Sequence, residues 1–97
     1  MSVSFNIPTI AKEEIQFFHF PKEDVLFSKE DKDKRSNDLK FAISLGNLDH
    51  QKVKILFQDV EGVKQTETTI WGVTDRDVIL KKGTIIPIHR IIQIKLI

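Results

Sequence analysis

His89 and Arg90 are the residues of this chain best suited to bind an anionic ligand, and they stand side by side in the closing segment TIIPIHRIIQIKLI (84–97). Arginine presents a rigid fork of hydrogen-bond donors and histidine adds a donor near neutral pH, so the pair could hold a phosphate. Alternatively, the two side chains could lie at a corner of the fold, donate to backbone carbonyls and pair with Asp75 or Asp77. We favour this structural role, which predicts a partly buried Arg90.

Four lysines could extend this pair into a basic surface for RNA. Lys52 and Lys54 alternate along a predicted strand and therefore share one face, but nothing in the sequence places Lys81 and Lys82 beside them. The candidate binding residues are Lys52, Lys54, Lys81, Lys82, His89 and Arg90. The net charge is only +1, which argues against strong non-specific attraction to a phosphate backbone.

Trp71 is a second candidate contact for a nucleic acid, because an indole can stack on a base. It lies in the middle of a predicted strand beside Gly72, and a glycine in a strand often marks a bend or a close backbone approach. We favour a role for Trp71 as an anchor of the core.

The sequence lacks the patterns of catalytic and metal-binding sites. Its three histidines do not form an HxxxH or HExxH spacing, and the chain has no cysteine. It contains no Gly-x-Ser-x-Gly motif, no phosphate-binding glycine loop and no carboxylate pair framed by apolar residues. We therefore expect a protein that is not an enzyme and that binds no metal and no small-molecule cofactor.

Length and composition predict one domain in the cytoplasm. Ninety-seven residues suffice for a single core, and 40% hydrophobic with 30% charged residues is ordinary for a soluble globular protein. The absence of cysteine favours a reducing compartment, and the N-terminus does not have the pattern of a secretory signal. No apolar run approaches twenty residues, so we expect no membrane span.

The second half of the chain is predicted to form consecutive strands. QKVKILFQD alternates apolar and polar residues, and the DVEG turn joins it to the Thr-rich VKQTETTIWGVT as an antiparallel hairpin. TDRD (74–77) and Gly83 mark two further turns around the short strand VILKK. Pro87 belongs at a strand edge or a bend, so we expect a corner between Pro87 and Ile91, formed by a short 3₁₀ turn.

This spacing of strands is typical of a small all-β barrel or sandwich, and a corner of this kind closes small five-stranded barrels. The residues expected in its core are Val53, Ile55, Phe57, Ile70, Val73, Ile79, Leu80, Ile86, Ile88, Ile91 and Ile94.

The first half of the chain has weaker signals. SNDLKFAISLGN favours a short helix (36–47) that ends at Gly46, although its apolar residues also alternate as in a strand. The preceding SKEDKDKRSND is expected to be a solvated loop or mobile linker, and IPTIAKEEIQFFHFPKEDVLF could be a short helix or an edge strand.

The order of these segments, with HQKVKILFQDVEG, DVILKKG and TIIPIHRIIQIKL after a helix, resembles the Sm-like and SH3-like small barrels over residues 38–97. The resemblance implies a mainly β, five-stranded barrel (48–97) preceded by the short helix (36–47) and an N-terminal arm with a charged loop (1–35). Asp75, Asp77 and Lys82 loosely match the positions at which Sm-like proteins hold an RNA base. The strings LGNL, TTIW and IPIHRI are also similar to a family of short uncharacterised bacterial proteins.

The function expected from these features is that of a non-catalytic binding or adaptor module of unknown specificity. Small barrels commonly present a sheet edge or a loop-lined face to other molecules, so we expect a protein partner or self-association. The alternative is a small RNA-binding barrel that uses the six basic residues named above.

Overall fold

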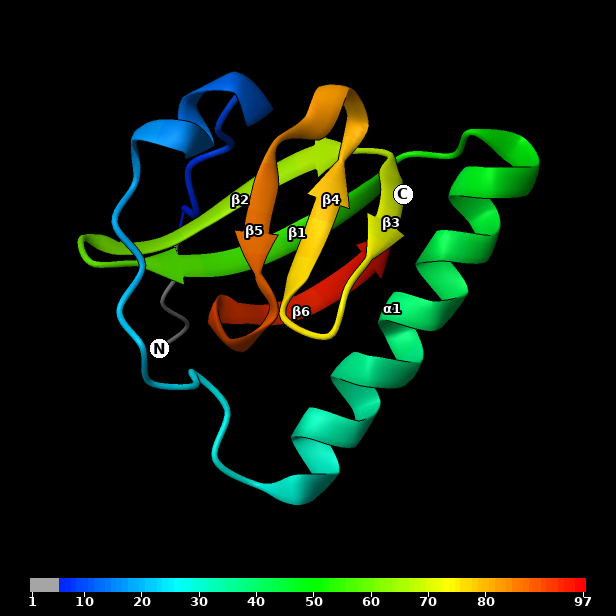
Figure 1. Cartoon of the computed structure of the whole chain (residues 1–97). Coiled ribbons are helices and arrows are strands. Elements are labelled where there is room, and N and C mark those ends of the chain that lie inside the picture. Colours follow the sequence, from blue (N-terminus) through cyan, green and yellow to red (C-terminus); the bar gives the residue numbers. More distant parts are fainter. Residues whose placement is uncertain (1–5) are drawn as a thin grey trace.

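Strands of the second half form two antiparallel sheets, and a long helix from the first half lies beside them (Figure 1). The computed structural model describes residues 6–97. Sheet A has the strand order β2-β1-β6 and sheet B the order β3-β4-β5. The elements are η1 (Lys12–Phe17), α1 (Lys29–Asp49), β1 (Val53–Asp59), β2 (Gly62–Thr68), β3 (Ile70–Val73), β4 (Asp77–Leu80), η2 (Lys81–Gly83), β5 (Ile85–Pro87), η3 (Ile88–Arg90) and β6 (Ile91–Leu96), where η marks a 3₁₀ helix.

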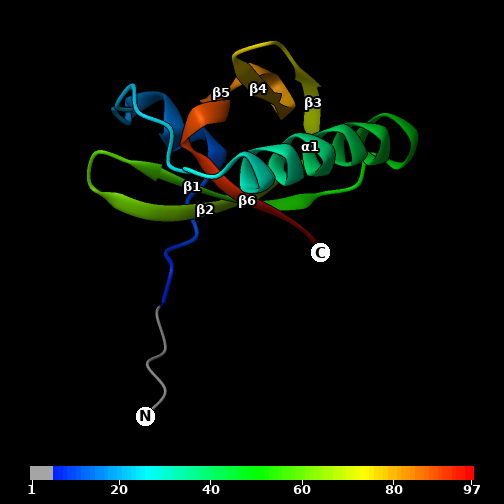
Figure 2. The same ribbon diagram turned by 90° about the horizontal axis from the view of Figure 1, so that it is seen from below.

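The predicted five-stranded barrel is wrong. The described strands form two separate three-stranded sheets: Thr69 separates β2 from β3 along the chain, and η3 separates β5 from β6. Helix α1 contacts β3 and β6 along one side, and η1 contacts β2 and β5 along the other. Figure 2 shows the sheets as two layers with α1 and η1 at opposite sides. About 36% of the described chain is helical and 35% is strand, so the domain is mixed α/β and not mainly β.

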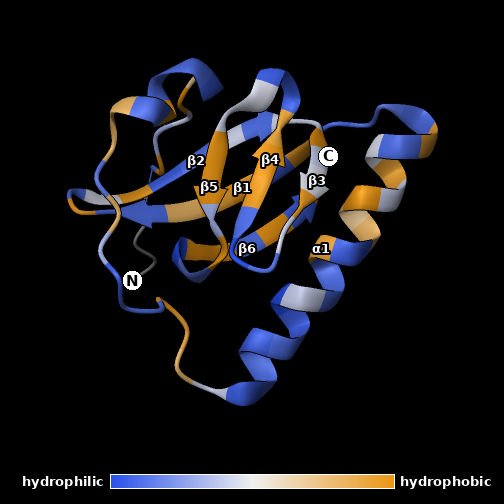
Figure 3. Cartoon of the chain, viewed as in Figure 1, coloured by the Kyte–Doolittle hydropathy of each residue, from blue (hydrophilic) through white to orange (hydrophobic). Residues whose placement is uncertain are grey.

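The core lies between the two sheets, and most of its predicted residues are confirmed. Eight of them are buried, and Val73 and Ile88 pack against this core while partly exposed. Ile79 was assigned to the wrong face of β4: Val78 is fully buried, and its neighbour Ile79 is turned outward. Figure 3 shows that β1, β4 and β5 are rich in hydrophobic residues, whereas the first half of α1 is hydrophilic.

The predictions for residues 28–47 need two corrections, because α1 starts at Lys29 and continues past Gly46 to Asp49. The run that was predicted to be a solvated loop is the first half of this helix. Ser28 caps it by accepting a hydrogen bond from the Asp31 N–H at 3.1 Å. Lys34 and Asp38 then form an i, i+4 ion pair at 2.8 Å, the spacing that supports a helix with charged faces.

Gly46 is the point at which α1 approaches sheet B most closely. A Cβ atom built on this residue would overlap the carbonyl oxygen of Ile70 and lie 3.2 Å from Cγ2 of Thr69. The absence of a side chain therefore lets the helix lie directly against β3. The helix ends three residues later, where His50 adopts a left-handed conformation and its N–H donates to the Gly46 carbonyl.

The corner predicted near Pro87 is confirmed. Pro87 ends the edge strand β5, and η3 follows it directly. The Leu80 N–H donates to the carbonyl of Thr84, and the Ile88 N–H donates to the carbonyl of Arg76. Hydrogen-bonded and non-hydrogen-bonded pairs alternate along antiparallel strands, so Pro87 occupies a non-hydrogen-bonded position opposite β4. The proline nitrogen is thus directed away from β4, and its missing N–H breaks no bond of the sheet.

The predicted β1–β2 hairpin is also confirmed, and a buried carboxylate stabilises its turn. Asp59 is only 2% exposed and accepts hydrogen bonds from Nζ of Lys64 at 2.7 Å and from the N–H groups of Glu61 and Gly62 at 3.1 Å. Burial raises the pKa of Asp59, but the hydrogen bond and charge of Lys64 and the two backbone donors outweigh burial and leave the pKa below its ordinary value.

We predict that Gly46→Ala destabilises the protein by about 2 kcal/mol, although alanine favours a helix by up to about 1 kcal/mol over glycine. The added methyl group would force α1 away from Ile70. Urea unfolding followed by circular dichroism measures the change. Asn47→Ala, at the next and exposed helix position, is the matched control and is expected to be neutral or slightly stabilising. Equal stability of Gly46→Ala and wild type would contradict the close approach.

A second prediction concerns pH. Asp59→Asn is expected to lower the free energy of unfolding at pH 7 on the order of 3 kcal/mol, because Lys64 would lose its buried anionic partner and keep only the exposed Glu61 at 3.4 Å. A lowered pKa stabilises the fold above the unfolded value of about 3.9, and this contribution is lost as the pH falls through the folded value. The difference between wild type and Asp59→Asn should therefore shrink below about pH 4. Unfolding curves at several pH values would refute this if the difference stayed constant.

Candidate functional site

The six basic residues proposed from the sequence do not form one surface. Lys52 directly precedes β1 and Lys54 lies near its start, whereas Arg90 donates from Nε to the carbonyl of Gln58 near its other end. The Lys81 N–H donates to the carbonyl of Thr69, the residue after β2, at the Lys52 end of the hairpin. The structure therefore places Lys52, Lys81 and Lys82 near one end of β1, and His89 and Arg90 near the other end.

His89 and Arg90 bind the chain's own backbone. Arg90 is 6% exposed, and its guanidinium donates to the carbonyls of Gln58 at 2.9 Å and Glu23 at 2.7 Å. His89 Nε2 lies 2.9 Å from the Pro21 carbonyl, which can only accept, so this nitrogen is the donor. The predicted structural role of Arg90 is confirmed, and its partners are backbone carbonyls. The pair fastens the N-terminal arm to the corner at η3.

Arg35 is a buried cation that the sequence analysis assigned to a solvated loop. Its Nη1 and Nη2 atoms donate to both carboxylate oxygens of Asp24 at 2.9 and 2.8 Å, and Nη1 also donates to the Ile91 carbonyl at 3.0 Å. Nε has no partner among the described residues. The hydrogen bond from Arg35 lowers the pKa of Asp24 and outweighs the opposing effect of burial. No sequence pattern marked this pair, because its two members are eleven residues apart and Arg35 lies in a run of many charged residues.

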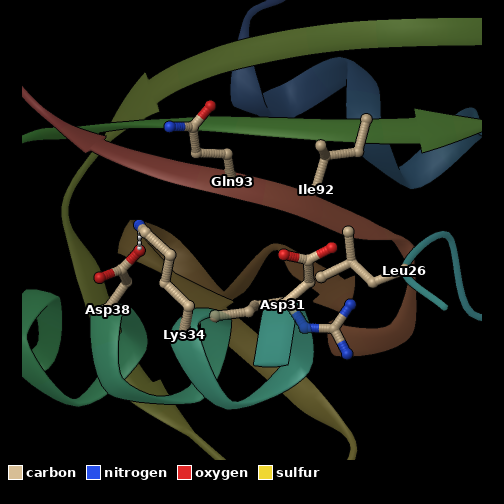
Figure 4. Close-up of a pocket in the computed structure, with 7 residues that line it drawn as sticks. Leu26, Asp31, Lys34, Asp38, Ile92 and Gln93 are labelled. Carbon is tan, nitrogen blue, oxygen red and sulfur yellow. Dashed lines mark hydrogen bonds and ion pairs between the residues drawn. The ribbon is translucent and has the colours of Figure 1, made fainter. Parts of the chain in front are cut away.

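Two open cavities flank Arg35. The first, of about 250 Å³, lies between α1 and β6, and Figure 4 shows Asp31, Lys34 and Asp38 along the helix and Ile92 and Gln93 on the strand. The second is about 580 Å³ and is lined by Lys22, Asp24, Arg35, Asp75, Arg76, Asp77, Pro87, Ile88 and His89. Both are lined by charges of both signs, so neither indicates one class of ligand. No group of three or more residues within 6–97 is arranged to hold a metal ion.

The outer surface of sheet B is apolar. Pairing between strands places Ile79 on β4 opposite Gly72 on β3 and Ile85 on β5. The register of β3 shifts between Ile70 and Gly72, so Trp71 is an extra residue at a bulge and opposes Ile79 together with Gly72. Trp71 is 51% exposed, which contradicts its predicted place in the core, and Ile85 is 50% exposed. We call the surface formed by Trp71, Ile79 and Ile85 the apolar face.

No helix or strand of the described chain lies over the centre of the apolar face, and Gln16 of η1 lies beside its Ile85 edge, where both residues line a cavity. In Figure 2 the two sheets are the outer layers, and α1 and η1 lie at the sides of the molecule. Gly72 adds no side chain there, and a Cβ atom at this position would only just reach Ile79, at 4.0 Å from Cδ1. The indole of Trp71 and the side chain of Ile85 are thus available to another molecule.

Comparisons with protein-family models, curated proteins and solved structures found no match for this chain. Within residues 6–97, no helix has both the length and the apolar character needed to cross a membrane.

We predict that Arg90→Ala lowers the free energy of unfolding by about 1 to 3 kcal/mol, because the carbonyls of Gln58 and Glu23 would lose the donor that this buried side chain supplies. Arg76→Ala is the matched control, since Arg76 is exposed and its side chain forms no hydrogen bond within residues 6–97, and it should change stability by less than about 0.5 kcal/mol. Thermal or chemical unfolding distinguishes the two variants. An unchanged stability of Arg90→Ala would show that its contacts are dispensable for the fold.

Proposed function

We propose that this chain is a non-catalytic binding module, that the apolar face is its binding surface, and that its partner is a protein. The observation that carries the proposal is the half-exposed Trp71 at a bulge in β3, beside the equally exposed Ile85 across the sheet. Tryptophan is the residue type most enriched among those that dominate binding energy at protein interfaces. Bulges often re-aim a side chain toward a functional surface.

The chemistry around the apolar face favours a protein partner over RNA. Trp71, Ile79 and Ile85 offer apolar area and no acid, base or nucleophile, and the charged residues at the two ends of β4 surround them. An apolar centre with a charged rim is the usual anatomy of a protein interface. An RNA surface would need converging cations, and the two groups of basic residues lie at opposite ends of β1.

A photoreactive amino acid placed at position 85 of the full-length protein, in living cells, tests this proposal. We expect a covalent protein adduct at position 85, and we expect Trp71→Ala to abolish it. The control position is 60, because Val60 is also an exposed apolar residue but lies in the β1–β2 turn, away from sheet B. Similar labelling at both positions would contradict the proposal. An adduct removed by ribonuclease would favour the RNA-binding alternative.

A further inference from the structure

We propose that the protein partner is a second copy of this chain, joined face to face by a two-fold axis that passes close to Ile79. This inference rests on the proposed binding role of the apolar face and names its occupant. The argument comes from the order of charged and apolar side chains along β4, the central strand of sheet B.

Side chains along a strand alternate between its two faces, and Val78 and Leu80 of β4 are buried. Asp77 and Ile79 therefore share the outer face, and Lys81 continues the same row one residue beyond the end of the strand. The row reads acid, isoleucine, base. Within the described residues, neither the Asp77 carboxylate nor the Lys81 ammonium group takes part in an ion pair with another side chain.

A row of this kind is complementary to itself. A two-fold axis that lies between the two faces, close to Ile79 and perpendicular to β4, makes the two β4 strands antiparallel. Each Asp77 then lies opposite Lys81 of the other copy, and the two Ile79 side chains meet at the centre. In such an interface residue i contacts residue j and residue j contacts residue i. The neighbouring charges agree with this order, because Asp75 and Arg76 offset each other at the acidic end and Lys82 adds a cation at the basic end.

The apolar face is small, which predicts a weak and reversible dimer. Sheet B has strands of four, four and three residues, so the face spans about 10 Å in each direction. A standard stable interface buries about 800 Å² on each partner, and smaller interfaces belong to transient complexes. We therefore expect dissociation in the micromolar range, with an affinity that falls as salt screens the charge pairs.

Sedimentation velocity over a concentration series tests the inference through charge reversal. Asp77→Lys and Lys81→Asp should each weaken self-association about tenfold or more, because each places like charges opposite one another. An equimolar mixture of the two variants should associate as wild type does, since both cross-pairs then have opposite charges. The double variant should also recover. Asp33→Lys, which makes the same charge change on the exposed surface of α1, should have no effect.

The single tryptophan of the chain links association to the apolar face. Its emission should shift to shorter wavelength as concentration rises, because dimerisation removes Trp71 from water. Retention of the dimer by both single variants, or no recovery on mixing, would overturn the two-fold arrangement. A monomer at every concentration with a position-85 adduct to another protein would overturn the inference and leave the proposed function standing. A monomer with no adduct would overturn both.

Discussion

Helix α1 lies along the gap between the free edges of β3 and β6, and the separation of the two sheets depends on this contact. Gly46 lets the helix lie against the backbone of Ile70, and Arg35 donates to the Ile91 carbonyl at the start of β6. Unpaired strand edges are a liability in water because they pair with other chains. The helix covers both edges at once, so hydrogen bonding need not continue around a closed barrel.

The N-terminal arm covers the other two edge strands, β2 and β5, at the opposite side of the domain. Its 3₁₀ helix contacts β2 and β5, and a residue just before it forms a short parallel bridge with β2. His89 and Arg90 hold the following stretch by binding the carbonyls of Pro21 and Glu23. His89 and Arg90, the two side chains best suited to bind a ligand, thus join the corner at η3 to the arm. Their donors satisfy the backbone carbonyls of Pro21, Glu23 and Gln58 in partly buried hydrogen bonds.

These two covers leave the outer faces of the sheets open, and the faces differ. Sheet A presents Lys54 between Glu67 and Lys95, a mixed and charged surface. Sheet B presents Trp71, Ile79 and Ile85, of which Trp71 and Ile85 are about half exposed. Neighbouring exposed apolar side chains are a common feature of interaction surfaces, and for this reason we propose the apolar face as the binding surface. The exposure of Trp71 and Ile85 is a feature that packing within the described chain does not explain.

Local sequence patterns were sufficient for the β1–β2 hairpin, the turns and the corner after Pro87, because alternation and turn chemistry are properties of neighbouring residues. They were not sufficient where packing decides. Val78, Ile79 and Leu80 are apolar and consecutive, so the sequence of β4 does not show which of them point inward. Pairing with the neighbouring strands buries Val78 and turns Ile79 outward. The bulge turns Trp71 outward. Arg35 became a buried residue of a longer helix because Asp24 and Ile91, both distant in sequence, supply its acceptors.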